Sequence, residues 1–186
     1  MHLKYEKSKR RDGETMQAKP NKPDQLELNY KRVALGMSDI ISTKLDLLFS
    51  FRRVSVENKI YSVFSKLSSQ ILMINLLNYK SRGALLIVEP VVLQRLTDKM
   101  LGGSGNGQSS TFEDFSDSEV FFNQQLVDWF TQEYSKADIE VDYIRSEREL
   151  QKIHFFFPDE DVQVVTLSAY INNEYAGQII ACHPKD

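Results

Sequence analysis

The chain has 186 residues, enough for one hydrophobic core of ordinary size, and its 41% hydrophobic and 26% charged residues are typical of globular proteins rather than of disordered or membrane proteins. Its single cysteine, Cys182, excludes an internal disulfide and a zinc site with several cysteine ligands, and it fits a reducing cytoplasm. No apolar run reaches the roughly 18 residues of a transmembrane helix, and the basic N-terminus lacks the apolar stretch of a secretory signal.

Charge is unevenly distributed along the chain. Residues 1–32 hold nine Lys or Arg and five Asp or Glu, a net charge of +4, whereas the rest holds fourteen and twenty-one, a net charge of −7. The first 30 residues have almost no large apolar side chains, and Pro20 and Pro23 would interrupt a helix. We therefore predict a disordered basic tail over residues 1–30 and a folded domain over residues 31–186. Such a tail is either a solvated arm or one that docks on an acidic surface or anionic lipid.

The domain opens with a helical pattern. Apolar residues recur at helical spacing and predict an amphipathic helix over residues 33–50. Val54 and Val56 alternate with polar residues, which is typical of a short strand. Tyr61 and Phe64 would then line one side of a short helix.

Two apolar strands and another helix are expected next. Residues 70–79 form a nearly continuous apolar run, as expected of a strand buried on both faces, and residues 84–88 form another. Arg82-Gly83 between them predicts a turn. Pro90 can begin a helix, because its missing N–H costs nothing in the first turn. The buried stripe of that helix would comprise Leu93, Leu96, Met100 and Leu101.

A glycine-rich stretch separates this helix from the next. Four of the eight glycines lie within residues 102–107, and the loop is predicted to continue to about Phe115. Residues 116–119 (Ser-Asp-Ser-Glu) predict a capping box that begins a long helix over residues 117–135, whose apolar face is unusually wide.

The remaining sequence predicts strands. Apolar residues alternate over residues 139–143, 153–157 and 162–171. The asparagine pair 172–173 supplies a turn, because asparagine tolerates positive φ, and residues 175–182 close a hairpin. These patterns predict an α/β fold.

The domain falls into two halves, residues 33–101 and 116–184. Each half begins with a long helix and continues into strands, although the sequence identity between them is negligible. Two helical layers around a largely antiparallel sheet are the natural packing of these elements. The halves suggest a pseudo-two-fold repeat.

The glycine-rich stretch is the most conspicuous candidate site. A phosphate-binding loop needs Gly-x4-Gly-Lys-Ser/Thr after a strand, whereas here the glycines follow a helix and no lysine lies between Met100 and Phe115. One glycine is explained by an ordinary helix C-terminus. The string containing Gly102, Gly103 and Gly105 indicates a binding surface for a partner, because exposed backbone N–H and C=O groups suit its close approach.

Other candidate sites are weaker, and neither a metal nor a cofactor is predicted. The three histidines, His2, His154 and His183, are too far apart in sequence to form a motif. Cys182 is expected to be a small core residue rather than a nucleophile. The carboxylates of Glu140, Asp142 and Glu147 are expected on a solvated strand face, with a local ion pair between Arg145 and Glu147.

Five segments resemble the flagellar motor switch family FliM. The helix end and loop at residues 97–105 (Thr-Asp-Lys-Met-Leu-Gly-Gly-Ser-Gly) resemble that family's helix and Gly-Gly-x-Gly loop. Residues 115–119 are similar to the start of its following helix, residues 139–147 to its next strand, residues 61–64 to its short helix, and residues 177–184 to the last strand of its middle domain.

The resemblance implies a three-layer α/β/α sandwich of the kind shared with CheC-type phosphatases. It implies neighbouring copies in the cytoplasmic ring of the flagellar motor, peripheral to the inner membrane, and FliG binding at Gly102, Gly103 and Gly105. It implies no enzymatic activity. FliM proteins bind phosphorylated CheY through an acidic N-terminal segment; residues 1–32 show no counterpart, so CheY remains an open partner. Nothing in the sequence favours nucleic acid.

Two alternatives stay open. The first is a CheC-like phosphatase of phosphorylated CheY, whose chemistry resembles a helix-borne Glu and Asn three residues apart. Here Phe122 lies three positions after Glu119 and Asn123 four, and residues 33–50 contain neither Glu nor Asn. The second alternative is an unrelated protein-binding adaptor domain.

Overall fold

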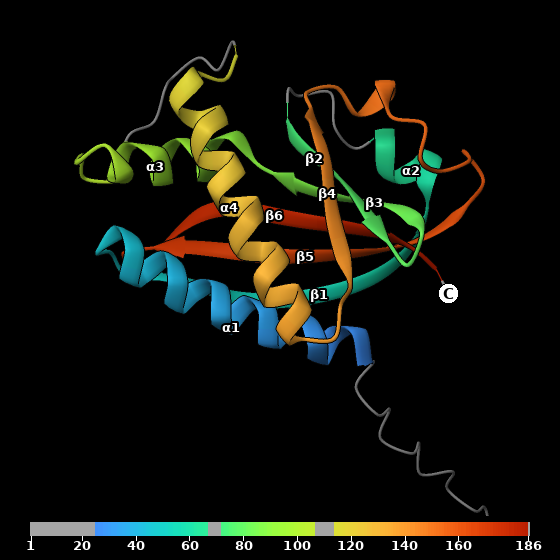
Figure 1. Cartoon of the computed structure of the whole chain (residues 1–186), viewed down its shortest axis with the longest axis horizontal. Coiled ribbons are helices and arrows are strands. Elements are labelled where there is room, and N and C mark those ends of the chain that lie inside the picture. The colour runs from blue at the N-terminus through green and yellow to red at the C-terminus, as the bar shows by residue number, and fades with distance from the viewer. Residues whose placement is uncertain (1–24, 67–71, 107–113, 186) are drawn as a thin grey trace, which may run out of the picture.

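The computed structural model describes residues 25–66, 72–106 and 114–185, and Figure 1 shows their arrangement. The predicted tail over residues 1–30 therefore lies mostly outside the described residues. The elements in chain order are α1 (Gln25–Leu45), β1 (Phe49–Ile60), α2 (Tyr61–Lys66), β2 (Met73–Tyr79), β3 (Arg82–Val88), α3 (Pro90–Met100), α4 (Asp117–Lys136), β4 (Val141–Glu147), the 3-10 turn η1 (Leu150–Lys152), β5 (Asp161–Ile171) and β6 (Glu174–Pro184).

The described strands form one six-stranded sheet in the order β1-β5-β6-β3-β2-β4, and every neighbouring pair is antiparallel. Exchanging β1 with β4, β2 with β5 and β3 with β6 reproduces the same order read backwards. The halves are thus related by a pseudo-two-fold axis between β3 and β6. The first strand of each half pairs with the hairpin of the other half: β1 pairs with β5, and β4 pairs with β2. The two halves are therefore interlocked.

The hairpin turns obey the same symmetry. Lys80 and Ser81 join β2 to β3 with φ of 48° and 63°, and the asparagine pair 172–173 joins β5 to β6 with φ of 51° and 69°. Two consecutive positive φ angles match the twist of the flanking strands, which is why two-residue hairpin loops favour them. The asparagine turn was predicted, but the turn expected at Arg82-Gly83 is wrong, because both residues belong to β3.

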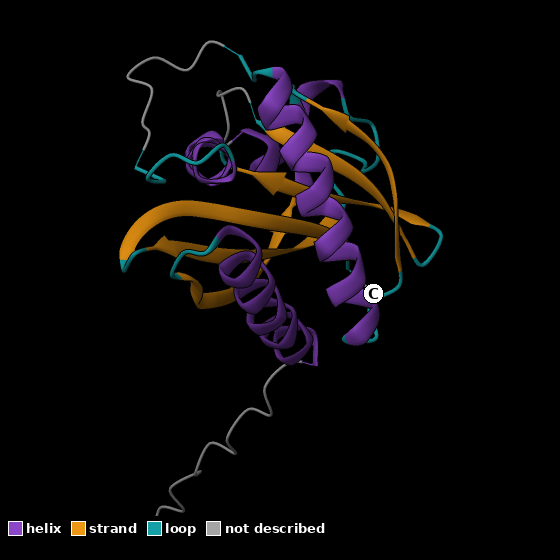
Figure 2. Cartoon of the chain, turned by 60° about the vertical axis from the view of Figure 1, so that its left-hand side comes forward, coloured by secondary structure: helices purple, strands orange, loops and turns teal. Residues whose placement is uncertain are grey.

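The sheet carries a thick helical layer on one face and a thin one on the other, which confirms the α/β/α prediction. Helices α1, α3 and α4 cover one face and enclose the larger core, and Figure 2 shows the long helices α1 and α4 on that side of the sheet. Short helix α2, η1 and residues 153–156 cover part of the other face and enclose a smaller core. Cys182 belongs to that smaller core and is fully buried, as expected.

The first helix lies earlier in the chain than the pattern predicted. Helix α1 begins at Gln25, so the expected domain boundary near residue 30 falls inside it, and Tyr30 is fully buried. Phe49, which was placed in the helix, instead begins β1. The polar residues around Tyr30 concealed this first part of the helix, because only one side of each turn meets the core.

One predicted strand is absent from the described residues. Ile153, Phe155 and Phe157 alternate in sequence, but Phe156 is buried and Phe157 is 76% exposed. The segment lies over β3, which is already paired with β2 on one side and with β6 on the other. It packs over the smaller core instead, where Phe155 lies against the backbone of Gly83.

Candidate functional site

The candidate site is built at the C-terminal end of α3. Gly103 N–H donates to the Asp98 carbonyl at 2.8 Å, and Gly102 N–H donates to the Lys99 carbonyl at 3.0 Å. Gly102 has a φ of 90°. These two bonds and the positive φ form a Schellman motif, which ends the helix and satisfies its last carbonyl groups.

A clamp formed by two α3 side chains, Arg95 and Asp98, then holds the loop. Arg95 Nε donates to the Gly105 carbonyl at 2.8 Å, and Asp98 Oδ2 accepts the Gly105 N–H at 2.9 Å. The side chains thus grip Gly105 through both its N–H and its carbonyl group. The clamp extends to the β5–β6 hairpin, because Arg95 also lies 3.6 Å from the Glu174 carboxylate.

Outside the clamp the loop presents a small exposed surface. Leu101, which was predicted to be part of the buried stripe of the helix, is 67% exposed. Nothing lies within 4 Å of the position that a Gly102 side chain would occupy. The exposed surface here is therefore an apolar side chain beside open backbone.

The sequence predicted this loop but not how its backbone is used. The N–H groups of Gly102, Gly103 and Gly105 are all donated within the chain, so they are not bare groups that await a partner. What the glycines provide is shape, because a Cβ at Gly103 would overlap the Asp98 carboxylate and Gly102 and Gly105 have positive φ. The loop is a structured surface rather than a slack connector.

The residues of the phosphatase alternative are engaged elsewhere. Glu119 accepts from the Ser116 N–H at 2.6 Å and from the Ser116 hydroxyl at 2.8 Å, which completes the predicted capping box of α4. Asn123 is 1% exposed and its amide pairs with that of Asn75 in β2. Neither side chain is placed to orient a water molecule at the surface.

The first helix offers no such pair either. The prediction considered residues 33–50, whereas α1 also includes Glu27 and Asn29. They lie two positions apart, so they project from different sides of the helix. Glu27 also forms an ion pair with Lys31 at 2.6 Å, and Asn29 accepts from Gln25 at 2.8 Å.

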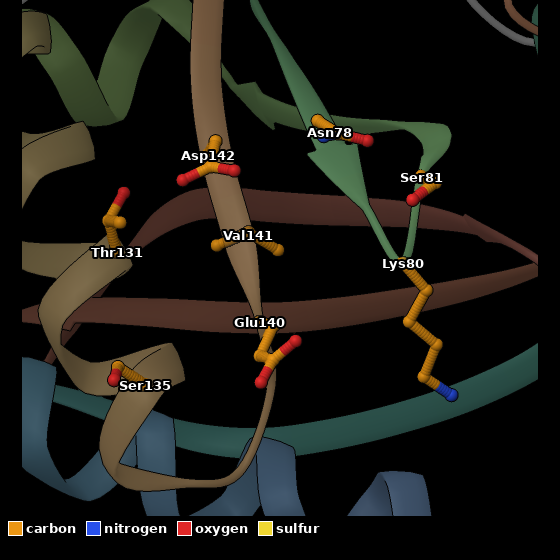
Figure 3. Close-up of a pocket in the computed structure, with 8 residues that line it drawn as sticks. All are labelled: Asn78, Lys80, Ser81, Thr131, Ser135, Glu140, Val141 and Asp142. Carbon is orange, nitrogen blue, oxygen red and sulfur yellow. The ribbon is translucent and has the colours of Figure 1, made fainter.

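A polar groove of about 460 Å³ lies between the β2–β3 turn, the C-terminal part of α4 and the start of β4 (Figure 3). Glu140 and Asp142 are exposed there, as predicted. Lys80 lines the opposite side of the groove, but its side chain points away from both carboxylates and its amino group lies over the Tyr79 ring. Neither histidine nor cysteine lines it, and the described residues include no cluster that could hold a metal. The lining residues are Asn78, Lys80, Ser81, Thr131, Ser135, Glu140, Val141 and Asp142.

Buried titratable groups serve the core. The Tyr30 hydroxyl bonds to the His183 ring, and burial raises the pKa of Tyr30 well above its usual value. Burial likewise raises the pKa of the Cys182 thiol, so its reactive thiolate is disfavoured. His154 is exposed and belongs to neither of these buried groups.

The predicted ion pair between Arg145 and Glu147 is present, with 3.0 Å between the guanidinium and the carboxylate.

Comparison with known proteins identifies the fold. No protein-family model matches the sequence, and the search of curated proteins also finds no match. Among solved structures, the FliM middle domain of Vibrio alginolyticus aligns with a TM-score of 0.73 at 19% identity, covering 87% of this chain and 94% of that one. A FliG–FliM complex from H. pylori aligns with a TM-score of 0.73 at 18% identity, covering 86% and 91%.

FliY of Thermotoga maritima aligns with a TM-score of 0.72 at 14% identity, covering 92% of this chain and 93% of that one. The three alignments confirm the fold expected from the sequence: the chain has the fold of FliM middle domains. No helix among the described residues is long and apolar enough to cross a membrane.

Proposed function

We propose that this chain is a component of a flagellar motor switch complex that binds a FliG-type rotor protein through its glycine loop. The observation that carries the proposal is the clamped loop at the end of α3, with Gly102, Gly103 and Gly105 shaping it and Leu101 exposed beside it. A FliM of the same fold is present in a FliG–FliM complex, which supports the partner's class.

The proposal includes association with further copies of the chain in a ring at the cytoplasmic side of the inner membrane. An interface of moderate strength that is repeated around a ring gains through multivalency, and a small change in contact free energy can bias it between two arrangements. Such a ring would couple a chemotactic signal to the direction of rotation. We propose a binding role rather than catalysis, because Glu119 and Asn123 are committed to the helix cap and the core.

The test is a calorimetric titration of the chain with the middle domain of a FliG-type protein from the same cell. Leu101→Asp introduces a charge at the exposed apolar side chain, and Leu101 has an ordinary φ of −81°, so the backbone is not strained. The matched control is Val63→Asp in α2, which is 52% exposed and lies on the other side of the sheet.

We expect Leu101→Asp to weaken binding by about tenfold or more, equivalent to about 1.4 kcal/mol, and Val63→Asp to bind as the wild type does. Equal loss in both variants would place the contact elsewhere. A wild-type chain that does not bind would reject the proposed partner, and ring assembly would then be tested by the concentration dependence of its mass.

A further inference from the structure

The clamp at Gly105 connects the end of α3, the glycine loop and the β5–β6 hairpin. Arg95 and Asp98 project from α3, Gly105 lies beyond the end of that helix, and Glu174 begins β6. The Gly105 peptide also lies against β5, since a Cβ there would be 3.9 Å from the Ile171 side chain. One helix end, one loop and one hairpin are therefore tied together at a single residue.

The burial of Arg95 indicates how strongly the loop is held. Its side chain is 4% exposed, and a guanidinium is removed from water at a high cost unless its N–H groups find acceptors. The acceptor here is the Gly105 carbonyl, and the Glu174 carboxylate, which is itself 76% exposed, is an ion-pair partner at 3.6 Å. If the Gly105 carbonyl moved away, the buried charge of Arg95 would lose its hydrogen-bond acceptor. The free-energy cost of that loss favours the observed conformation of the loop.

The clamp also requires glycine at position 103. A Cβ on Gly103 would overlap both oxygens of the Asp98 carboxylate. Asp98 can accept the Gly105 N–H only because position 103 has no side chain. The glycine and the clamp therefore depend on one another.

We propose that Arg95 and Asp98 are positioning residues for the FliG-type partner, which hold the surface of Leu101 and Gly102 in its binding conformation before the partner arrives. The inference rests on the proposed function. The clamp lies behind the exposed surface, so it acts by removing the entropy loss that ordering a loose loop would impose on binding.

The variants are chosen to separate the clamp from the contact surface. Asp98→Ala removes the acceptor, whereas Asp98→Asn keeps one amide oxygen that can accept the Gly105 N–H. Gly103→Ala displaces the Asp98 carboxylate, but in an Asp98→Ala background there is no carboxylate for it to displace. Asp128→Ala on α4 is the matched control, because it removes an exposed carboxylate that accepts a local hydrogen bond from Gln124.

Two readouts are measured on the same proteins: partner affinity by calorimetry, and hydrogen exchange of the Gly105 amide by nuclear magnetic resonance. We expect Asp98→Ala and Gly103→Ala to speed exchange of that amide and to weaken partner binding by about tenfold. Asp98→Asn should remain within about threefold of the wild type, and the double variant should bind no worse than Asp98→Ala alone.

The outcomes are distinct. Fast exchange with unchanged affinity in Asp98→Ala would overturn the positioning role while leaving the proposed function intact. Unchanged exchange in Asp98→Ala would show that the clamp does not hold the loop. A wild-type chain that does not bind the partner at all would reject the proposed function, and the positioning role with it.

Discussion

The buried amide pair between α4 and β2 provides a quantitative prediction about stability. Asn75 and Asn123 are at most 1% exposed, and they exchange two hydrogen bonds, of 2.8 and 3.2 Å. Asn75 also donates to the Leu86 carbonyl at 3.1 Å and accepts from the Ser146 hydroxyl at 2.7 Å, and Asn123 donates to Ser146 at 3.3 Å. The network joins α4, β2, β3 and β4.

The two alanine substitutions should differ in cost. Asn123→Ala removes three bonds but leaves each polar group of Asn75 with a partner, so we expect a loss of about 2 kcal/mol in the free energy of unfolding. Asn75→Ala also leaves the buried amide oxygen of Asn123 without the donor it has now, so we expect about 3–4 kcal/mol. Because the two bonds between them are counted in both variants, the double variant should show a coupling of about 1–2 kcal/mol.

The assay is urea unfolding followed by circular dichroism, with Asn58→Ala on the exposed edge of β1 as the control. The control should change stability by no more than about 0.5 kcal/mol. The reasoning is refuted if Asn75→Ala and Asn123→Ala are additive within about 0.5 kcal/mol, because the amides would then not act as a pair.

Three further substitutions test other local interactions by the same unfolding assay. Ser116→Ala should cost about 1 kcal/mol, since it removes the hydroxyl of the α4 capping box; no change would show that the cap is replaced by water. Gly36→Ala should destabilise despite the better helix propensity of alanine, because its Cβ would overlap the Glu133 carboxylate packed against α1; a gain of about 1 kcal/mol would contradict this packing. Tyr61→Phe should be neutral or stabilising at pH 7, because the Tyr61 hydroxyl is buried and finds no hydrogen-bond partner among the described residues. Burial raises the pKa of Tyr61 to about 12, so between pH 10 and 12 the phenol ionises in the unfolded chain but stays protonated in the folded one. Over that range the free energy of unfolding of the wild type should therefore fall more steeply with pH than that of the Phe variant, and parallel pH curves would contradict this.

Local signals were sufficient wherever the structure depends on neighbouring residues. Pro90 begins α3, Ser116 caps α4, and the asparagine pair 172–173 forms the β5–β6 turn, all as predicted. Each of these features is decided within about four residues, by a missing N–H, a side-chain acceptor or tolerance of positive φ. The resemblance of five segments to a known family, among them the loop at residues 97–105, likewise predicted the fold that the comparisons confirm.

The failures share a different cause. Tyr30 looked like part of a polar tail because its partners, His183 and Tyr134, lie more than 100 residues away in the chain. Residues 153–157 had a strand pattern but lie over β3, which is already paired on both sides, and a strand needs a partner for its backbone groups. Leu101 fitted the apolar stripe of α3, yet it extends beyond the helix end, into solvent.

The sequence by itself thus determined the type of most elements, the caps and turns at their ends, and the position of the glycine loop between two helices. Only the tertiary structure decided that the halves exchange their first strands, that Asn75 meets Asn123, and that Arg95 closes on Gly105. The physical reason is range: propensity, capping and periodicity act within one or two turns of chain. Strand order, burial and the pairing of distant polar groups are instead decided when separate segments compete for the same space.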